Sequence, residues 1–306
     1  MRYRITHHTG YQYGERVSLS HTVVRLRPRD HAGQSCLRHQ ITIWPAPNTR
    51  SDRLDYFANH VTYFSVKESH EQLTIDSQSE VEVRAPAEGC LSLPMGWEQA
   101  RQALLDAASP EALLAREFSF DSPYVARSAE LHAYALPSFA PGRPFLQAVY
   151  ELTQRIHSDF EFLPGSTTVG TPVLEVLRSR RGVCQDFAHL EIGCLRSMGL
   201  AARYVSGYLA TTPPPGQQRL VGADVSHAWI GVFSPECGWI DFDPTNGVMV
   251  STGHMTVAWA RDYDDVGPIR GILIGGRRQK LYVAVDVVPV EVEADANTGM
   301  GDPAAT

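Results

Sequence analysis

The chain has 306 residues, of which 43% are hydrophobic and 20% are charged, and its formal net charge is −7 at pH 7. These proportions are those of a folded globular protein and exclude a largely disordered, collagen-like or coiled-coil chain. The negative charge argues against a nucleic-acid partner, because phosphate contacts need clustered cations. No apolar run has the length of a membrane span, and the polar start does not resemble a signal peptide, so we expect a cytoplasmic protein without a membrane partner.

The first 86 residues are predicted to form a β-sandwich domain. Short runs rich in Val, Ile, Thr, Tyr and Phe alternate with polar or Pro breaks, and these runs cover residues 3–9, 20–28, 38–45, 60–66 and 80–86. Short strands at such regular spacing are typical of a sandwich. The Pro- and Gly-containing segment 85–96 then predicts a linker.

A second domain, over residues 97–294, is predicted to begin after the linker. The apolar spacing becomes helical there and predicts helices over residues 97–107, 110–117, 128–136 and 144–160. A further helix is expected to begin at Cys184, because Gly182 interrupts the preceding pattern, and to stop at Gly199. Strands are predicted over residues 201–209, 226–234, 238–243 and, as one or two more, 280–293. The fold class is therefore α+β, and the acidic residues 295–306 are predicted to be a flexible tail.

The five cysteines are odd in number and include no CxxC pair, which indicates free thiols in a reducing compartment. Cys184 differs from the others because a helix start offers unpaired N–H groups and the positive end of the helix dipole, both of which stabilise a thiolate. Cys36, Cys90, Cys194 and Cys237 are expected to be small buried residues.

No metal ion or other cofactor is expected from the sequence. The pair His7–His8 has no further ligand nearby, so it does not predict a zinc site. The acidic cluster Asp262, Asp264 and Asp265 lacks the spacing of an EF-hand, and we expect it to lie in a solvated loop.

A nucleophilic cysteine needs a base. The predicted strands 226–234 and 238–243 are expected to supply it. They form a hairpin in which His227 and Asp243 share a face. If Phe233 pairs with Trp239, Asp243 is a diagonal neighbour of His227, and a slip of two residues places the two directly opposite each other. Asp241 also lies on this face, but it is nearer the turn, so Asp243 is the favoured partner.

Three motifs in this order resemble the bacterial transglutaminase-like superfamily: RRGVCQDFAHL (180–190), SHAWIGVF (226–233) and GWIDFDPTNG (238–247). The resemblance extends over nearly the whole chain, through YRITHHTGYQY near the start, VVRLRPR (23–29), GLAARYVSGYL (199–209) and VAWARDYDDVGPIRG (257–271). It departs at Ala260, where relatives usually have Gly, and this affects only a local turn.

The resemblance implies an N-terminal β-sandwich followed by a papain-like, transglutaminase-type core of helices packed on an antiparallel sheet. It also implies a Cys–His–Asp triad in which Cys184 is the nucleophile, His227 the base and Asp243 the orienting carboxylate. Such a triad predicts a thiol-dependent amide hydrolase, or cysteine protease, that takes a peptide or amide substrate and forms a thioester. The alternatives are a transglutaminase or amide-forming acyltransferase, and a non-catalytic binding or scaffold protein.

Neighbours of the triad are weaker candidates. Gln185, Trp229 and Trp239 are expected to bind substrate or, for Gln185, to help stabilise an oxyanion, with ordinary packing as the alternative for both tryptophans. Asp186 and His189 belong to the CQDFAH motif, but their places on the helix predict structural roles. The sequence predicts no particular oligomeric state.

Overall fold

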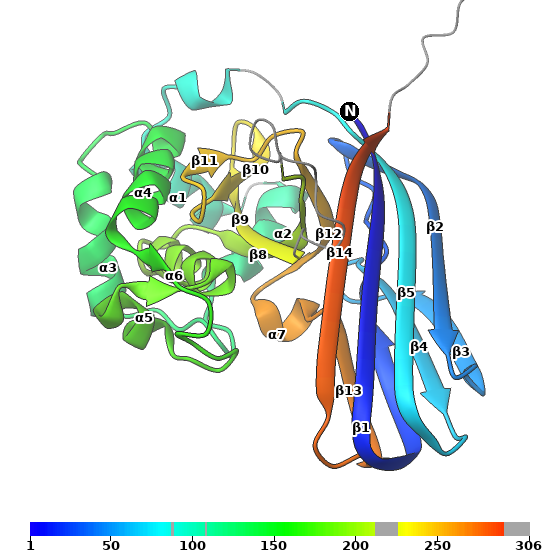
Figure 1. Ribbon diagram of the computed structural model, residues 1–306. Coiled ribbons are helices and arrows are strands. Elements are labelled where there is room, and N and C mark those ends of the chain that lie inside the picture. The colour runs from blue at the N-terminus through cyan, green and yellow to red at the C-terminus, as the bar shows by residue number, and fades with distance from the viewer. Residues whose placement is uncertain (87–88, 108, 212–225, 291–306) are drawn as a thin grey trace, which may run out of the picture.

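A curled antiparallel sheet forms the N-terminal part of the protein in this computed structural model, which describes residues 1–86, 89–107, 109–211 and 226–290. Its seven strands are β1 (Arg2–Val24), β2 (Gln34–Trp44), β3 (Thr49–Leu54), β4 (His60–Val66), β5 (His70–Val83), β13 (Ile269–Gly275) and β14 (Lys280–Val290). The first half of β1 pairs with β5 and β14, and the second half pairs with β4 and β13. Because β1 changes partners, the sheet curls around its own apolar core (Figure 1).

The two C-terminal strands belong to this N-terminal sheet, and this corrects the predicted extent of the second domain to residue 294. Strand β14 pairs with β1 from Arg2↔Val290 to Gln12↔Lys280. Val285 and Val287 are buried in the same cluster as Ile5. The alternation of Val residues predicted a strand correctly, but alternation alone does not say which sheet a strand joins. The predicted tail, residues 295–306, lies outside the described residues.

A second, five-stranded sheet lies between the curled sheet and a layer of helices (Figure 1). Its order is β11-β10-β9-β8-β12, with bounds β8 (Ala202–Leu209), β9 (Ser226–Ser234), β10 (Gly238–Asp243), β11 (Val248–Met249) and β12 (His254–Ala260). Strands β6 (Glu161–Phe162) and β7 (Arg181–Gly182) form a separate short pair. The α+β class predicted from the sequence is thus the class observed.

The α-helices are α1 (Trp97–Asp106), α2 (Pro110–Arg116), α3 (Ala129–Ala135), α4 (Phe145–Asp159), α5 (Val173–Ser179), α6 (Cys184–Ser197) and α7 (Tyr263–Val266). Short 3₁₀ turns are η1 (Cys90–Ser92), η2 (Glu117–Ser119) and η3 (Leu136–Ser138). The predicted helices agree with α1, α2, α3, α4 and α6 to within about two residues, whereas α5 and α7 were not predicted. None of the helices in the described ranges is long and apolar enough to cross a membrane.

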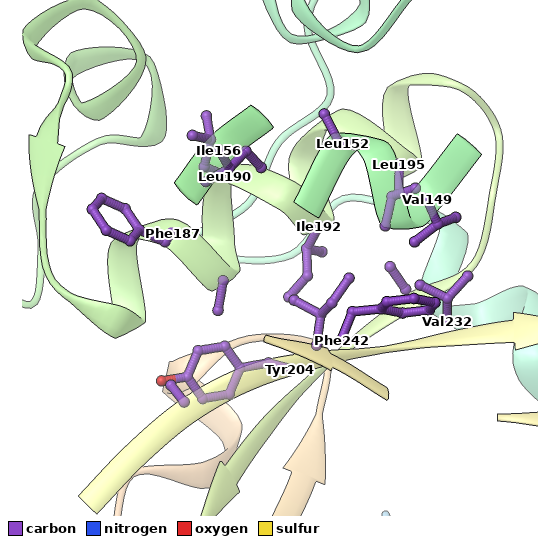
Figure 2. Packing of buried hydrophobic residues seen from close by; sticks show 14 of the residues in the cluster. Val149, Leu152, Ile156, Phe187, Leu190, Ile192, Leu195, Tyr204, Val232 and Phe242 are labelled. Atoms are coloured by element: carbon purple, nitrogen blue, oxygen red, sulfur yellow. The ribbon is translucent and has the colours of Figure 1, made fainter. Parts of the chain in front are cut away.

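Helices α4 and α6 pack together on one face of the second sheet. The apolar stripe predicted for α4 is buried, and Leu152 and Ile156 are fully inaccessible to solvent. Figure 2 shows Ile156 beside Leu190 and Leu152 above Ile192, both of α6, with Phe242 of β10 on the sheet side of this core. Burial of each such side chain contributes about 1.5–3 kcal/mol, so this core fixes α6 firmly against the sheet.

Candidate active site

Cys184 is the first residue of α6, as predicted, and its side chain is half-buried. Asp186 caps the helix by accepting the backbone N–H of Val183 at 2.8 Å. A Cβ at position 182 would lie 2.8 Å from the Cβ of Asp186, so Gly182 allows the chain to pass this capping carboxylate. The backbone N–H groups of the first helical turn have no acceptor within the helix, and this end therefore favours a negatively charged sulfur.

His227 reaches the same place from β9. The hairpin pairs Trp239 with Phe233, which is the first of the two registers considered from the sequence. In this register the Nε2 atom of His227 lies 2.8 Å from Oδ2 of Asp243, and the carboxylate is fully buried. Because Asp243 occupies Nε2, the hydrogen bond between His227 and Cys184 is assigned to Nδ1.

The three groups influence one another's protonation. Burial lowers the pKa of His227, but hydrogen bonds to Asp243 and Cys184, with the charges of both groups, outweigh burial and raise this pKa to about 10. Burial raises the pKa of Asp243, but hydrogen bonds from His227 and His254 outweigh it and hold this pKa below its ordinary value. The site thus favours an imidazolium at His227 beside the ionised carboxylate of Asp243.

Asp243 is held by more donors than the triad alone requires. Its Oδ1 atom accepts the backbone N–H groups of Thr245 at 2.9 Å and Asn246 at 3.2 Å. Its Oδ2 atom accepts the side-chain amide of Asn246 at 2.6 Å and lies 3.1 Å from Nε2 of His254, in addition to its bond with His227. This network fixes the orientation of the carboxylate, because a buried ionised carboxylate is tolerated only when its acceptor sites are filled.

His254 was not predicted from the sequence. It begins β12, a strand that sequence analysis did not predict, although the alternating run HMTVAWA (254–260) carries a signal for one. The strand could have been found in this way, but its contact with Asp243 could not. That contact depends on a strand order in which β9 and β8 lie between β10 and β12.

A metal ion would find one set of ligands among the residues that the structure describes. The ligand atoms of His227, Asp243 and His254 all lie within 4.8 Å of one another, and all three residues are buried. Hydrogen bonds already join both imidazoles to the carboxylate, so the grouping is explained without a metal.

Asp241, the alternative partner for His227, is engaged elsewhere. Its Oδ2 atom accepts the indole N–H of Trp229 at 3.1 Å, and its Oδ1 atom lies 3.5 Å from the guanidinium of Arg203. Trp229 is fully buried and packs against the rings of both His227 and His254. Trp229 therefore packs against both histidines and exposes no surface, which favours the packing alternative over a contact with substrate.

Trp239 and Gln185 have partners outside the proposed triad. Trp239 stacks on Arg203, whose guanidinium carbon is 4.3 Å from the ring centre, and it lines two cavities of about 600 and 450 Å³ between the curled sheet and the second sheet. The Gln185 side chain donates to the carbonyl of Val169 at 3.1 Å. These contacts give both residues structural partners, and neither contact is with Cys184.

The other motif residues have the structural roles expected of them. His189 accepts the backbone N–H of Tyr263 at 3.1 Å, and burial, aided by the charge of Arg196, lowers its pKa to about 3. His7 shares hydrogen bonds with Tyr208 and Thr9. The acidic residues differ from the expected solvated loop in two respects. Asp264 and Asp265 lie in α7, and Asp262 is fully buried and caps this helix, because its carboxylate accepts backbone N–H groups.

Two family descriptions match the chain. The bacterial transglutaminase-like N-terminal region matches residues 3–82, and the transglutaminase-like superfamily matches residues 134–244. An uncharacterised protein of Mycobacterium tuberculosis is 44% identical over 301 residues, which cover 96% of this chain and 94% of the relative. The chain belongs to the transglutaminase-like superfamily.

Further comparisons extend the likeness of this transglutaminase-like chain. A protein of Mycobacterium leprae is 35% identical over 290 residues, covering 94% of this chain and 98% of its own. The solved structure of a proposed cysteine protease from Cytophaga hutchinsonii has a TM-score of 0.75 at 20% identity, covering 96% of this chain and 92% of that one, and this shows a shared fold. A protein-glutamine gamma-glutamyltransferase of Pseudomonas aeruginosa is 38% identical over 68 residues, which are 22% of this chain and 10% of that protein.

Proposed function

We propose that the chain is a thiol-dependent amide hydrolase that acts on a peptide or another amide. Cys184 is the nucleophile, His227 the general base and acid, and Asp243 the group that orients the imidazole. The observation that carries the proposal is the chain of contacts from a buried carboxylate, through Nε2 of His227, to a thiol at a helix start. Family membership supports a cysteine-dependent function in general.

The proposed reaction follows from this arrangement. The thiolate of Cys184 attacks the amide carbonyl carbon, and the carbonyl oxygen takes up the negative charge. When the C–N bond breaks, the imidazolium of His227 gives its proton to the departing amine, and a thioester remains on the sulfur. His227 then takes a proton from water, whose oxygen attacks the thioester and releases the acid and the thiolate.

The oxyanion needs donors that are already in place. The backbone N–H of Cys184 lies at the start of α6, where helix geometry leaves it without an internal acceptor. In other acyl-transfer enzymes one such donor contributes about 3–4 kcal/mol to the transition state. We therefore assign this N–H as one oxyanion donor.

Amide formation is the second candidate. A short part of the chain matches a protein-glutamine gamma-glutamyltransferase, and the name of that protein includes this type of reaction. The two reactions share the thioester and differ only in whether water or an amine attacks it. Hydrolysis is favoured here because no feature of the sequence indicates a device that excludes water in favour of an amine.

A screen of peptide and small-amide substrates tests the proposal, with wild type and Cys184→Ala assayed side by side. Release of an amine by wild type and not by Cys184→Ala supports a thiol mechanism. Adding a primary amine separates the candidates, since transamidation gives a new amide detectable by mass spectrometry whereas hydrolysis gives only the acid. Equal and slow alkylation of all five thiols would instead favour a non-catalytic scaffold.

A further inference from the structure

A second histidine holds the carboxylate of the proposed triad. His254 is 6% exposed, and its Nδ1 atom lies 3.4 Å from the backbone N–H of Ser251, which it accepts as a long hydrogen bond. A neutral imidazole that accepts at Nδ1 carries its proton on Nε2. His254 therefore donates from Nε2 to Oδ2 of Asp243, 3.1 Å away, on the same oxygen that receives His227.

The place of His254 depends on the curled N-terminal sheet. His254 begins β12, the edge strand of the second sheet, and β12 pairs with β8 along one side only. Along its other side, the Gln34 side chain donates to the carbonyl of Thr256 at 2.7 Å and accepts the N–H of the same residue at 2.8 Å. A side-chain amide thus replaces a neighbouring strand two residues from His254.

A second amide makes the same pattern of bonds farther along the strand. Asn59 donates to the carbonyl of Trp259 at 3.0 Å and accepts its N–H at 3.0 Å. Gln34 and Asn59 are 1% and 0% exposed, and each buried amide also bonds outside β12: Gln34 donates to the carbonyl of Arg29 at 2.8 Å, and Asn59 donates to Asp55 at 3.2 Å and accepts from the guanidinium of Arg29 at 2.5 Å. Gln34 bonds to Thr256, two residues from His254, whereas Asn59 bonds to Trp259, five residues from His254. This difference makes Asn59 a control for Gln34.

We propose that His254 is a positioning residue for the carboxylate of Asp243, and that the N-terminal sheet sets the position of His254 through the Gln34 amide. This inference rests on the proposed function for its effect on catalysis. It gives the N-terminal domain a specific task, which is to fix the edge strand that carries the second histidine. The N-terminal domain and the candidate site are then one functional unit.

Two substitutions at His254 test the first half of the proposal. His254→Phe keeps a planar ring against Trp229 but removes the donor, whereas His254→Gln keeps a donor. Loss of one hydrogen bond to a charged group corresponds to roughly a tenfold effect. We expect His254→Phe to lower the rate of Cys184 alkylation by iodoacetamide at pH 6 by about tenfold, and His254→Gln to restore much of that rate.

The ring signals of His227 in ¹H–¹⁵N NMR give a readout that does not depend on activity. The Nε2–H proton of His227 should exchange with water faster in His254→Phe than in wild type and be protected again in His254→Gln. Unchanged proton exchange and unchanged alkylation in His254→Phe would overturn the proposal. If wild-type Cys184 reacts no faster than Cys36, the proposed function fails, whereas the NMR result still decides the role of His254.

Gln34→Leu and Asn59→Leu test the second half. Both remove a buried amide from β12, so both should lower the melting temperature, and Asn59→Leu by at least as much, because Asn59 also bonds to Arg29 and Asp55. We expect the exchange of the His227 Nε2–H proton to accelerate in Gln34→Leu and to stay near the wild-type rate in Asn59→Leu. Equal acceleration in both variants would show a general loss of stability and would overturn the assignment of Gln34.

Discussion

Asp243→Asn tests whether the buried carboxylate controls the imidazole. Burial lowers the pKa of His227, but Asp243 and Cys184 together raise it from 6.5 to about 10. At 1.36 kcal/mol per pH unit, this difference corresponds to about 5 kcal/mol in favour of the imidazolium, shared between the two partners. Asparagine keeps the size of the side chain and removes the charge, so we expect the pKa of His227 to fall by about 1–3 pH units.

The assay is an NMR titration of the His227 ring in wild type, Cys184→Ala, Asp243→Asn and the double variant. In Cys184→Ala the carboxylate acts alone, and the pKa of His227 should stay above 6.5. In the double variant only burial remains, and the pKa should fall below 6.5. If adding Asp243→Asn to Cys184→Ala leaves the pKa of His227 unchanged, the carboxylate does not act on the imidazole and the reasoning is refuted.

The same shift predicts how stability depends on pH. Because folding raises the pKa of His227, its contribution to the free energy of unfolding is complete below the unfolded pKa of 6.5 and is lost as pH rises to about 10. The difference in unfolding free energy between wild type and Asp243→Asn should thus be largest near pH 6 and shrink towards pH 10 in urea titrations. A difference that grows with pH over this range would contradict the account.

Three further predictions concern residues around the site. Burial is the main cause that raises the pKa of Glu191, so its carboxyl destabilises the fold increasingly as pH rises above its unfolded pKa. In urea denaturation, Glu191→Gln should therefore be more stable than wild type by a larger margin at pH 8 than at pH 5. Gly182→Ala should lower the free energy of unfolding by about 1–3 kcal/mol, because its Cβ would meet Asp186, whereas the control Gly170→Ala, whose Cβ meets nothing, should be near neutral; equal effects would refute the steric reason. A chelator should leave the alkylation rate of Cys184 unchanged, and a fall in that rate would point to a metal held by the histidines.

The local features of the site could be predicted from the sequence because they depend on short-range rules. The helix start at Cys184 follows from a glycine break and an apolar stripe, and the structure begins α6 at this residue. The shared face of His227 and Asp243 follows from strand alternation in a short hairpin. The choice of Asp243 over Asp241 rested on distance from the turn, and the hydrogen bond to His227 agrees with it.

Long-range pairing could not be predicted in the same way. The sequence of β14 predicts a strand, yet its partner β1 lies at the other end of the chain. Strand β3 is polar and fully exposed, so it lacks the alternation that marks a half-buried strand. His254 belongs to no motif identified in the sequence, and its contact with Asp243 depends on how the strands are ordered in the sheet.

The reactivity of the five thiols measures the central claim most directly. Each cysteine is labelled with isotopically coded iodoacetamide at pH 6, where an unassisted thiol is almost entirely protonated. The account predicts that Cys184 reacts fastest of the five in wild type and loses this advantage in His227→Ala. Similar slow rates for all five thiols, or a fast Cys184 that does not need the imidazole, would contradict it.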